Sequence, residues 1–222
     1  MNLNSSKNNK KLIGELMKDY KIFKDEIKKR LKSFKDLGNK GNKNEIFAEL
    51  AFCILTPQSR AKMCWDAIEN MRKNGILFNG NREEILKDLK GVRFKYKKSY
   101  YLLEAREKFF SENNPIYYFI KNKNNPNGIR DYLIKNIKGL GCKEASHFLR
   151  NIGLGSDLAI LDRHILKNLM KLGVIQDLKK TCTERTYKDI EKKMKDFSKS
   201  FGIPLDHLDL LLWAKETGEV FK

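Results

Sequence analysis

The stretch that decides the fold is Arg130–Gly153, RDYLIKNIKGLGCKEASHFLRNIG. Apolar residues recur at helical spacing on both sides of its centre: Ile129, Tyr132, Leu133 and Ile137 before it, and Ala145, Phe148, Leu149 and Ile152 after it. Between the two stripes, Lys138–Gly141 has the composition of a tight turn. The pattern predicts two short helices, within 129–152, joined by a glycine turn.

The turn contains two glycines on either side of one apolar residue. Gly139 and Gly141 can adopt backbone conformations closed to other residues, and Leu140 can fill the space between the helices. We expect the amides of both glycines and of the following helical turn to point outward, as an anion site suited to a DNA phosphate. Gly-Leu-Gly in this setting predicts a helix-hairpin-helix rather than an ordinary helical hairpin.

Charge points to a polyanionic partner. The 222 residues include 46 Lys and Arg against 28 Asp and Glu, a formal net charge of +18. A compact fold bears that excess at a cost in self-repulsion. Nucleic acid is the favoured partner, because phosphates release counterions to a basic surface. An acidic membrane surface is the alternative, and composition does not separate DNA from RNA.

Helical spacing of apolar residues extends over almost the whole chain. One stripe, for example, runs from Ile13 through Ile22 to Leu31. The segments Gly38–Asn44 and Asn122–Gly128 are expected to be loops. No run alternates as a strand would, so the fold class is expected to be all-α.

We expect two helical lobes packed together, with a DNA-binding cleft. Residues 40–153 would form one lobe, with the helix-hairpin-helix at 129–152. Residues 1–39 and 154–222 would form the second lobe. Neither expected loop is long enough to act as a flexible linker between independent domains.

The cysteines predict neither a metal site nor disulfides. Cys53, Cys64, Cys142 and Cys182 form no CxxC pair, and the chain has only 3 histidines. A zinc site or an iron–sulfur cluster needs clustered ligands, so we expect no metal and no other cofactor. Cys53 and Cys64 lie on apolar helical stripes and are expected to be buried free thiols.

Targeting signals are not evident. Met1–Lys11 is polar and lacks the apolar core of a signal peptide. The longest apolar run, Ile46–Leu55, includes Glu49 and is too short to span a bilayer. We therefore expect an intracellular, cytoplasmic and nucleoid-associated protein that has no membrane partner.

Two residues stand out as candidates for catalysis. Lys143 lies in the first turn of the second hairpin helix, where the positive end of the helix favours the neutral amine that a nucleophile needs. The same position fits a phosphate contact equally well. Asp162 follows the apolar run Leu158–Leu161 and opens the next helix. An aspartate there is expected to cap the helix, and it can also stabilise a developing positive charge.

These motifs resemble a known family. GLGCKEA at 139–145, followed by AILDRHI at 159–165, resembles the hairpin, lysine and aspartate of the helix-hairpin-helix DNA glycosylase superfamily. The resemblance extends back to Leu55–Arg60, LTPQSR. It extends forward to Leu210–Lys222, LLLWAKETGEVFK, which is similar to the archaeal-type second family of 8-oxoguanine DNA glycosylases/AP lyases. The match covers most of residues 45–222.

The resemblance implies an enzyme that excises 8-oxoguanine from double-stranded DNA. Lys143 would form a Schiff base that permits strand cleavage by β-elimination, with assistance from Asp162. Gln58 would enter the gap left by the flipped base. Trp213 would stack on that base, and the terminal carboxylate of Lys222 would reach it.

Further contacts follow from this mechanism. Arg60 and the hairpin amides would hold phosphates. Phe94 is a second candidate for stacking on the flipped base, although packing in a surface loop suits it somewhat better. For Trp213, core packing is an equally good interpretation. We expect the enzyme to act as a monomer.

Two other functions stay open at this point. One is a related glycosylase for oxidised pyrimidines, which the tail Trp213–Lys222 disfavours. The other is a non-catalytic helix-hairpin-helix DNA-binding protein, which the pair Lys143 and Asp162 disfavours.

Overall fold

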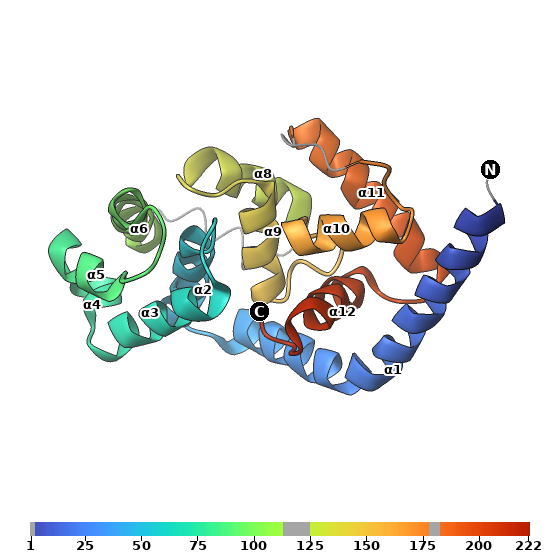
Figure 1. The fold of residues 1–222 in the computed structure, drawn as a ribbon. Helices are drawn as coiled ribbons and strands as arrows, with labels where there is room; N and C mark the ends of the chain where they lie inside the picture. The colour runs from blue at the N-terminus through green and yellow to red at the C-terminus, as the bar shows by residue number, and fades with distance from the viewer. Residues whose placement is uncertain (1–2, 113–124, 178–182) are drawn as a thin grey trace. The chain divides into compact units, whose positions relative to one another are not determined.

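The fold is all-helical, as the sequence predicts. The computed structural model describes residues 3–112, 125–177 and 183–222, and within these ranges it contains helices and no strand. The helices form two compact units (Figure 1). We call Phe34–Gly155 the hairpin unit, and Met1–Ser33 with Ser156–Lys222 the terminal unit.

The hairpin unit is built around one buried helix, α2 (Lys43–Leu55), whose residues from Ile46 to Leu55 are all buried. A capping box between Asn42 and Glu45 fixes its start. Helix α2 packs on α3, α6 and α9, while α8 pairs with α9 (Figure 1). The other helices of the unit are α3 (Ala61–Lys73), α4 (Ile76–Asn79), α5 (Arg82–Asp88), α6 (Lys95–Phe110), α8 (Pro126–Asn136) and α9 (Cys142–Asn151), together with the end of α1 (Leu3–Lys40).

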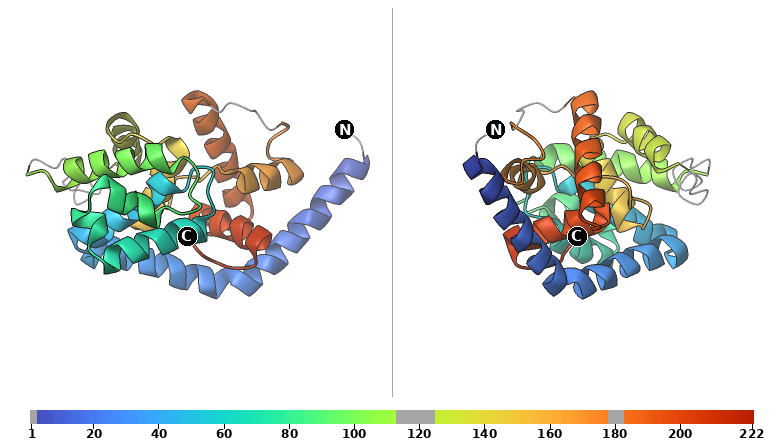
Figure 2. Two further views of the ribbon diagram at one scale, coloured as in Figure 1. Left: turned by 60° about the vertical axis from the view of Figure 1, so that its left-hand side comes forward. Right: turned by 90° about the vertical axis from the view of Figure 1, so that its right-hand side faces the viewer.

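The terminal unit is centred on α12 (Leu205–Thr217), which packs on α10 (Arg163–Lys171) and α11 (Glu184–Ser200) (Figure 2). Its leucine-rich sequence is buried around most of its circumference. Polar contacts join the helices further. Tyr20 of α1 bonds His207 at 3.0 Å, and Asn168 of α10 donates to Glu216 at 3.1 Å.

The stripe predicted along α1 is partly wrong. Leu16, Ile27 and Leu31 are buried as expected, but Ile22 has 73% of its surface exposed. Because α1 is one helix of 38 residues, its apolar positions do not all face the same neighbours.

The prediction of a loop at Gly38–Asn44 is also wrong. Helix α1 continues to Lys40 and α2 begins at Lys43, which leaves two residues between them. A Cβ atom at Gly38 would lie 1.9 Å from the carbonyl oxygen of Ile152 at the end of α9. This glycine therefore permits a close approach of two helices and does not form a turn.

The loop expected at Asn122–Gly128 needs a similar correction. Residues 122–124 lie outside the described ranges, whereas Pro126–Gly128 form the first turn of α8. The Asn125 side chain caps this turn by accepting from the amide of Gly128 at 2.9 Å. Proline, like an Asn cap, is favoured at a helix start, so the residues that suggested a loop begin a helix.

The described cysteines form no disulfide. Cys53 and Cys64 are buried, as predicted, and Cys142 is half-buried, while Cys182 lies outside the described residues. Burial raises the pKa of Cys64 to about 11 and that of Cys53 well above its usual value. The described part of the chain has no cluster of three or more potential metal ligands and no helix suited to crossing a membrane.

Candidate active site and DNA-contact loops

The predicted helix-hairpin-helix is present as α8, a short turn and α9 (Figure 1). Leu140 is 6% exposed and fills the space in the turn, as expected. Gly139 has a φ of +91°, and a Cβ atom there would lie 2.7 Å from the Tyr101 ring of α6. Both the backbone conformation and the close contact therefore require glycine at this position.

A buried arginine holds the two hairpin helices together. Arg130 of α8 is 1% exposed, and its Nη1 donates to Ser146 Oγ of α9 at 3.2 Å. Its Nη2 donates to Asn127 Oδ1 at 3.1 Å. Nothing in the sequence marks this residue, because one arginine among 46 cationic residues carries no distinguishing signal.

The amide of Gly141 does not point freely outward as expected. It donates to Glu144 Oε2 at 3.2 Å, and its φ of −102° is open to any residue. Glu144 stands three positions into the helix, where a glutamate commonly bonds the backbone of the capping residue. This spacing was the sequence signal that was overlooked. The amide of Gly139, by contrast, has no acceptor among the described residues.

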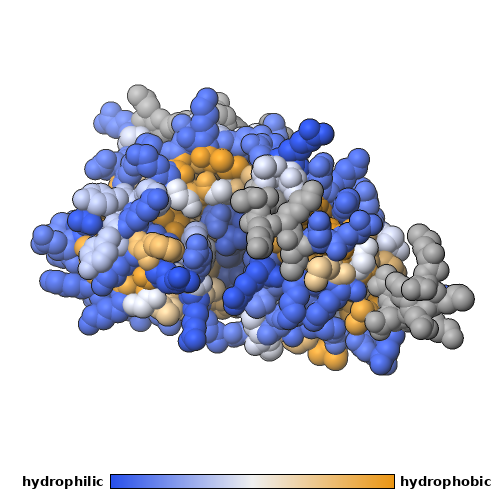
Figure 3. All heavy atoms as spheres, turned by 45° about the horizontal axis from the view of Figure 1, so that its top comes forward, coloured by the Kyte–Doolittle hydropathy of each residue, from blue (hydrophilic) through white to orange (hydrophobic). Residues whose placement is uncertain are grey.

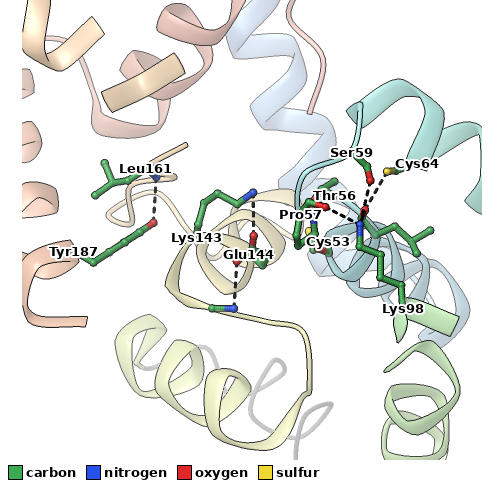
Figure 4. A network of polar contacts seen from close by, with 12 residues as sticks. Cys53, Thr56, Pro57, Ser59, Cys64, Lys98, Lys143, Glu144, Leu161 and Tyr187 are labelled. Atoms are coloured by element: carbon green, nitrogen blue, oxygen red, sulfur yellow. Dashed lines mark hydrogen bonds and ion pairs between the residues drawn. The ribbon is translucent and has the colours of Figure 1, made fainter. Parts of the chain in front are cut away.

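Lys143 is the second residue of α9 and lies beside the same carboxylate. Its Nζ is 3.0 Å from Glu144 Oε1, and its side chain is 25% exposed. Figure 4 shows the lysine and glutamate side chains meeting near the start of the helix. One carboxylate thus contacts both the candidate nucleophile and the candidate phosphate site.

Asp162 caps α10, as predicted. Its Oδ1 accepts from the amides of His164 and Ile165, both at 2.8 Å. Its Oδ2 makes no hydrogen bond within the described part of the chain. Since the side chain is only half-buried, this second oxygen is left for another interaction.

The chain that leads into Asp162 is fixed by α11. The Tyr187 hydroxyl donates to the carbonyl of Ala159 at 2.6 Å. It also accepts from the amide of Leu161 at 3.2 Å, a bond that Figure 4 shows. Glu191 accepts from the amide of Ala159 at 2.8 Å. These contacts join residues about 30 positions apart, which is why the sequence alone did not reveal them.

Gln58 lies in a tight turn after α2. The amide of Ser59 donates to the carbonyl of Thr56 at 3.0 Å, with Pro57 and Gln58 at the two central positions. A φ of +55° at Gln58 and proline before it match a type II turn, in which glycine is the usual residue. The side chains of Gln58 and Arg60 are both exposed.

Phe94 directly precedes α6 and is also in the left-handed region, with a φ of +58°. Its side chain is 56% exposed, so packing in a surface loop does not account for it. The guanidinium of Arg93 lies 5.6 Å from the centre of its ring.

Trp213 is half-buried near the end of α12. Its ring centre is 6.4 Å from that of Phe221, with 31° between the planes. The chain turns back after α12 at Gly218, whose φ is +83°, and Val220 is 4% exposed. The burial of Val220 and the contact of Phe221 with Trp213 therefore anchor the segment that ends in the half-buried Lys222.

Each unit thus groups some of the predicted residues. The hairpin unit contains Lys143, Gly139, Leu140 and Gly141 on one hairpin, and Gln58, Arg60 and Phe94 on two loops. The terminal unit contains Asp162 at the start of α10, and Trp213 and Lys222 at and after the end of α12.

Comparison with known proteins gives one consistent family. Residues 27–203 match the model of the Ogg-HhH family, 8-oxoguanine DNA glycosylase. A Fusobacterium nucleatum protein named 8-oxoguanine DNA glycosylase/AP lyase is 48% identical over 210 residues, which cover 94% of this chain and 97% of that protein.

Two solved structures are similar as well. The 8-oxoguanine DNA glycosylase of Thermotoga maritima has a TM-score of 0.85 at 32% identity, over 96% of this chain and 100% of that one. The Methanocaldococcus jannaschii 8-oxoguanine glycosylase/lyase, in complex with DNA containing 8-oxoguanine, has a TM-score of 0.83 at 36% identity, over 94% and 100%. With its helix-hairpin-helix, its lysine at the start of α9 and this match, the chain belongs to the 8-oxoguanine DNA glycosylase family.

Proposed function

We propose that this protein excises 8-oxoguanine from double-stranded DNA and then cuts the strand at the abasic site. The observation that carries the proposal is the family match over residues 27–203. The relative named 8-oxoguanine DNA glycosylase/AP lyase, 48% identical over almost the whole chain, supports both activities. The net charge of +18 and the largely hydrophilic face in Figure 3 suit a DNA substrate.

Lys143 is the proposed nucleophile. Its neutral amine attacks the anomeric carbon, the bond from that carbon to the base breaks, and the base leaves with the electron pair. The amine loses a proton when it forms the new bond, and this proton neutralises the departing base. Opening of the sugar ring gives a Schiff base on Nζ. This group accepts electrons when the neighbouring carbon loses a proton, so the 3′ phosphate departs by β-elimination. Glu144, at 3.0 Å, is placed to accept the proton that Lys143 loses.

Asp162 is the proposed electrostatic partner. Its Oδ1 is held by two backbone amides, which leaves Oδ2 to stabilise the positive charge that develops on the sugar. The bonds from Tyr187 to the chain before Asp162 restrict where the carboxylate can lie.

DNA contact is assigned to the two turns of the hairpin unit. The hairpin around Leu140 and the exposed Arg60 bind phosphates, and Gln58 fills the stack vacated by the flipped base. Glu144 occupies the amide of Gly141, so a phosphate that binds there has to displace its carboxylate.

Recognition of the base is assigned to Trp213, with Phe94 as a second stacking residue and the terminal carboxylate of Lys222 as the acceptor. Oxidation converts the acceptor nitrogen of the guanine five-membered ring into a donor. A site that accepts a hydrogen bond from this N–H leaves two acceptors facing each other when guanine enters, and such a mismatch discriminates strongly.

A panel of duplexes that carry 8-oxoguanine, an oxidised pyrimidine or no lesion tests the proposal. We expect release of 8-oxoguanine, strand cleavage, and a covalent complex trapped by borohydride. Lys143→Gln should bind DNA but give no trapped complex. Preference for the pyrimidine would indicate the related glycosylase, and binding without release or trapping would indicate a DNA-binding module. A trapped complex in Lys143→Gln would exclude Lys143 as the nucleophile.

A further inference from the structure

Two exposed side chains of the hairpin unit have a strained backbone. Among the described residues, Gln58 and Phe94 are the non-glycine residues with positive φ. Such a conformation is unfavourable for a residue with a Cβ atom, and it persists only where the surroundings impose it. The two residues lie 36 positions apart in the sequence, yet the same polar cluster holds both.

The centre of this cluster is Lys98 of α6, which is 4% exposed. Its ammonium donates to the carbonyls of Leu55 and Pro57, both at 2.7 Å, and to Ser59 Oγ at 3.1 Å. Figure 4 shows the ammonium reaching the turn that follows α2. All three ammonium donors thus have acceptors on the two sides of Gln58.

The same cluster reaches the loop of Phe94. The backbone amide of Lys98 donates to the carbonyl of Phe94 at 3.0 Å. The amide of Arg93 donates to Ser59 Oγ at 3.0 Å, so this hydroxyl serves both loops. The turn at Gln58 and the start of α6 are therefore joined by the side chains of Lys98 and Ser59.

We infer that Lys98 and Ser59 are positioning residues that hold Gln58 and Phe94 in one fixed arrangement, so that the side chain that fills the vacated stack and the side chain that stacks on the flipped base are preformed as a pair. The inference rests on the proposed function, since it assumes that Gln58 fills the vacated stack. It adds that the positions of these two side chains are coupled through Lys98 and Ser59, and that neither loop has to become ordered on binding.

The chemistry of Lys98 supports a positional role. Burial of an ammonium is unfavourable, and it lowers the pKa of Lys98 to about 8. An apolar side chain of similar length would fill the same space without that cost. The ammonium nevertheless provides what an apolar group lacks, which is three directed bonds to the end of α2 and the turn that follows it.

The test uses Lys98→Met, which keeps the buried stem and removes the donors. Ser59→Ala is a second, smaller change that keeps the test valid should the Met variant fold poorly. Lys97→Met, at the neighbouring exposed lysine, is the matched control for loss of one charge. The readouts are single-turnover release of 8-oxoguanine from a duplex, and cleavage of a preformed abasic site in single-stranded DNA, which has no stack to fill.

We expect Lys98→Met and Ser59→Ala to slow release from the duplex by about tenfold or more, equivalent to about 1.4 kcal/mol. Lys97→Met should stay close to the wild type, and abasic cleavage in single strands should be unchanged in all three. In a Gln58→Ala, Phe94→Ala background, adding Lys98→Met should cause little further loss, because its effect passes through these two residues.

A wild-type rate of release in both Lys98→Met and Ser59→Ala would overturn the inference. An equal loss of cleavage on the single-stranded substrate would also overturn it. So would an undiminished effect of Lys98→Met on release in the Gln58→Ala, Phe94→Ala background. Failure of the proposed function is recognised separately. It would appear as no release by the wild type, or as a wild-type rate in the Gln58→Ala, Phe94→Ala protein, whatever residue 98 is.

Discussion

Lys143 and Glu144 form an ion pair at the start of α9, with 3.0 Å between Nζ and Oε1. The second oxygen of Glu144 accepts from the Gly141 amide at 3.2 Å. On the proposed assignments, the carboxylate contacts both the nucleophilic lysine and the phosphate site. A DNA phosphate would then compete with this carboxylate for the Gly141 amide.

This arrangement predicts the effect of Glu144→Gln on DNA binding. The amide oxygen of glutamine can still accept from Gly141, but the negative charge beside the phosphate site is gone. Affinity for an undamaged duplex should rise several-fold, with a steeper salt dependence. Fluorescence anisotropy at two salt concentrations measures both. The control is Glu184→Gln, which removes a carboxylate that pairs with Lys188 on α11. An equal gain in DNA affinity in both variants would mean that only the net charge of the protein matters.

Asp162→Asn separates capping from catalysis. Asparagine caps a helix as well as aspartate does, so the free energy of unfolding should be near that of the wild type. Loss of the charge should slow release of 8-oxoguanine and formation of the trapped complex by tenfold or more. Urea unfolding and single-turnover kinetics check the two parts. Asp162→Ala, which also loses the cap, should be destabilised by about 1 kcal/mol. Full activity in Asp162→Asn would mean that Asp162 has only a capping role.

The segment after α12 provides a test of base recognition. Removing Lys222 shortens the segment anchored by Val220 by one residue, about 3.5 Å. A hydrogen bond does not survive such a displacement, so release of 8-oxoguanine should slow. Cleavage of a preformed abasic site should be spared, because it has no base to recognise. Trp213→Ala should show the same selectivity, and equal losses on both substrates would remove this segment from the recognition site.

The lowered pKa of Lys98 predicts a dependence of stability on pH. Between pH 8 and about 10.5, the unfolded chain binds more protons at this lysine than the folded chain does. Raising the pH therefore favours the folded state. Below pH 8 the lysine is protonated in both states, so its contribution to the free energy of unfolding no longer changes with pH. The stability of the wild type relative to Lys98→Met should rise across this range, by at most about 1.4 kcal/mol per pH unit.

Urea unfolding at pH 7.5 and 9.5 measures this difference. Lys97→Met should follow the wild type at both pH values, because its ammonium is exposed. Parallel curves for the wild type and Lys98→Met would show that the buried ammonium has no unusual pKa.

The sequence predicted the features that depend on neighbours along the chain. Helical spacing identified the hairpin, and Gly-Leu-Gly located its turn with Leu140 inside it. It failed at Gly38, because a glycine that permits a close approach looks the same as one in a loop. It missed Lys98 and Tyr187, whose partners lie 43 and 28 residues away in the chain. Such contacts depend on tertiary packing, and no local pattern marks them.

The two buried thiols have a consequence for an enzyme that repairs oxidised DNA. The thiolate is the form of cysteine that peroxides attack. Because burial raises the pKa of Cys53 and Cys64, both stay protonated at neutral pH. The oxidants that generate the damaged base thus meet these two sulfur atoms in their least reactive form. Oxidation of the core around α2 is therefore slow under the same conditions that produce the damaged base.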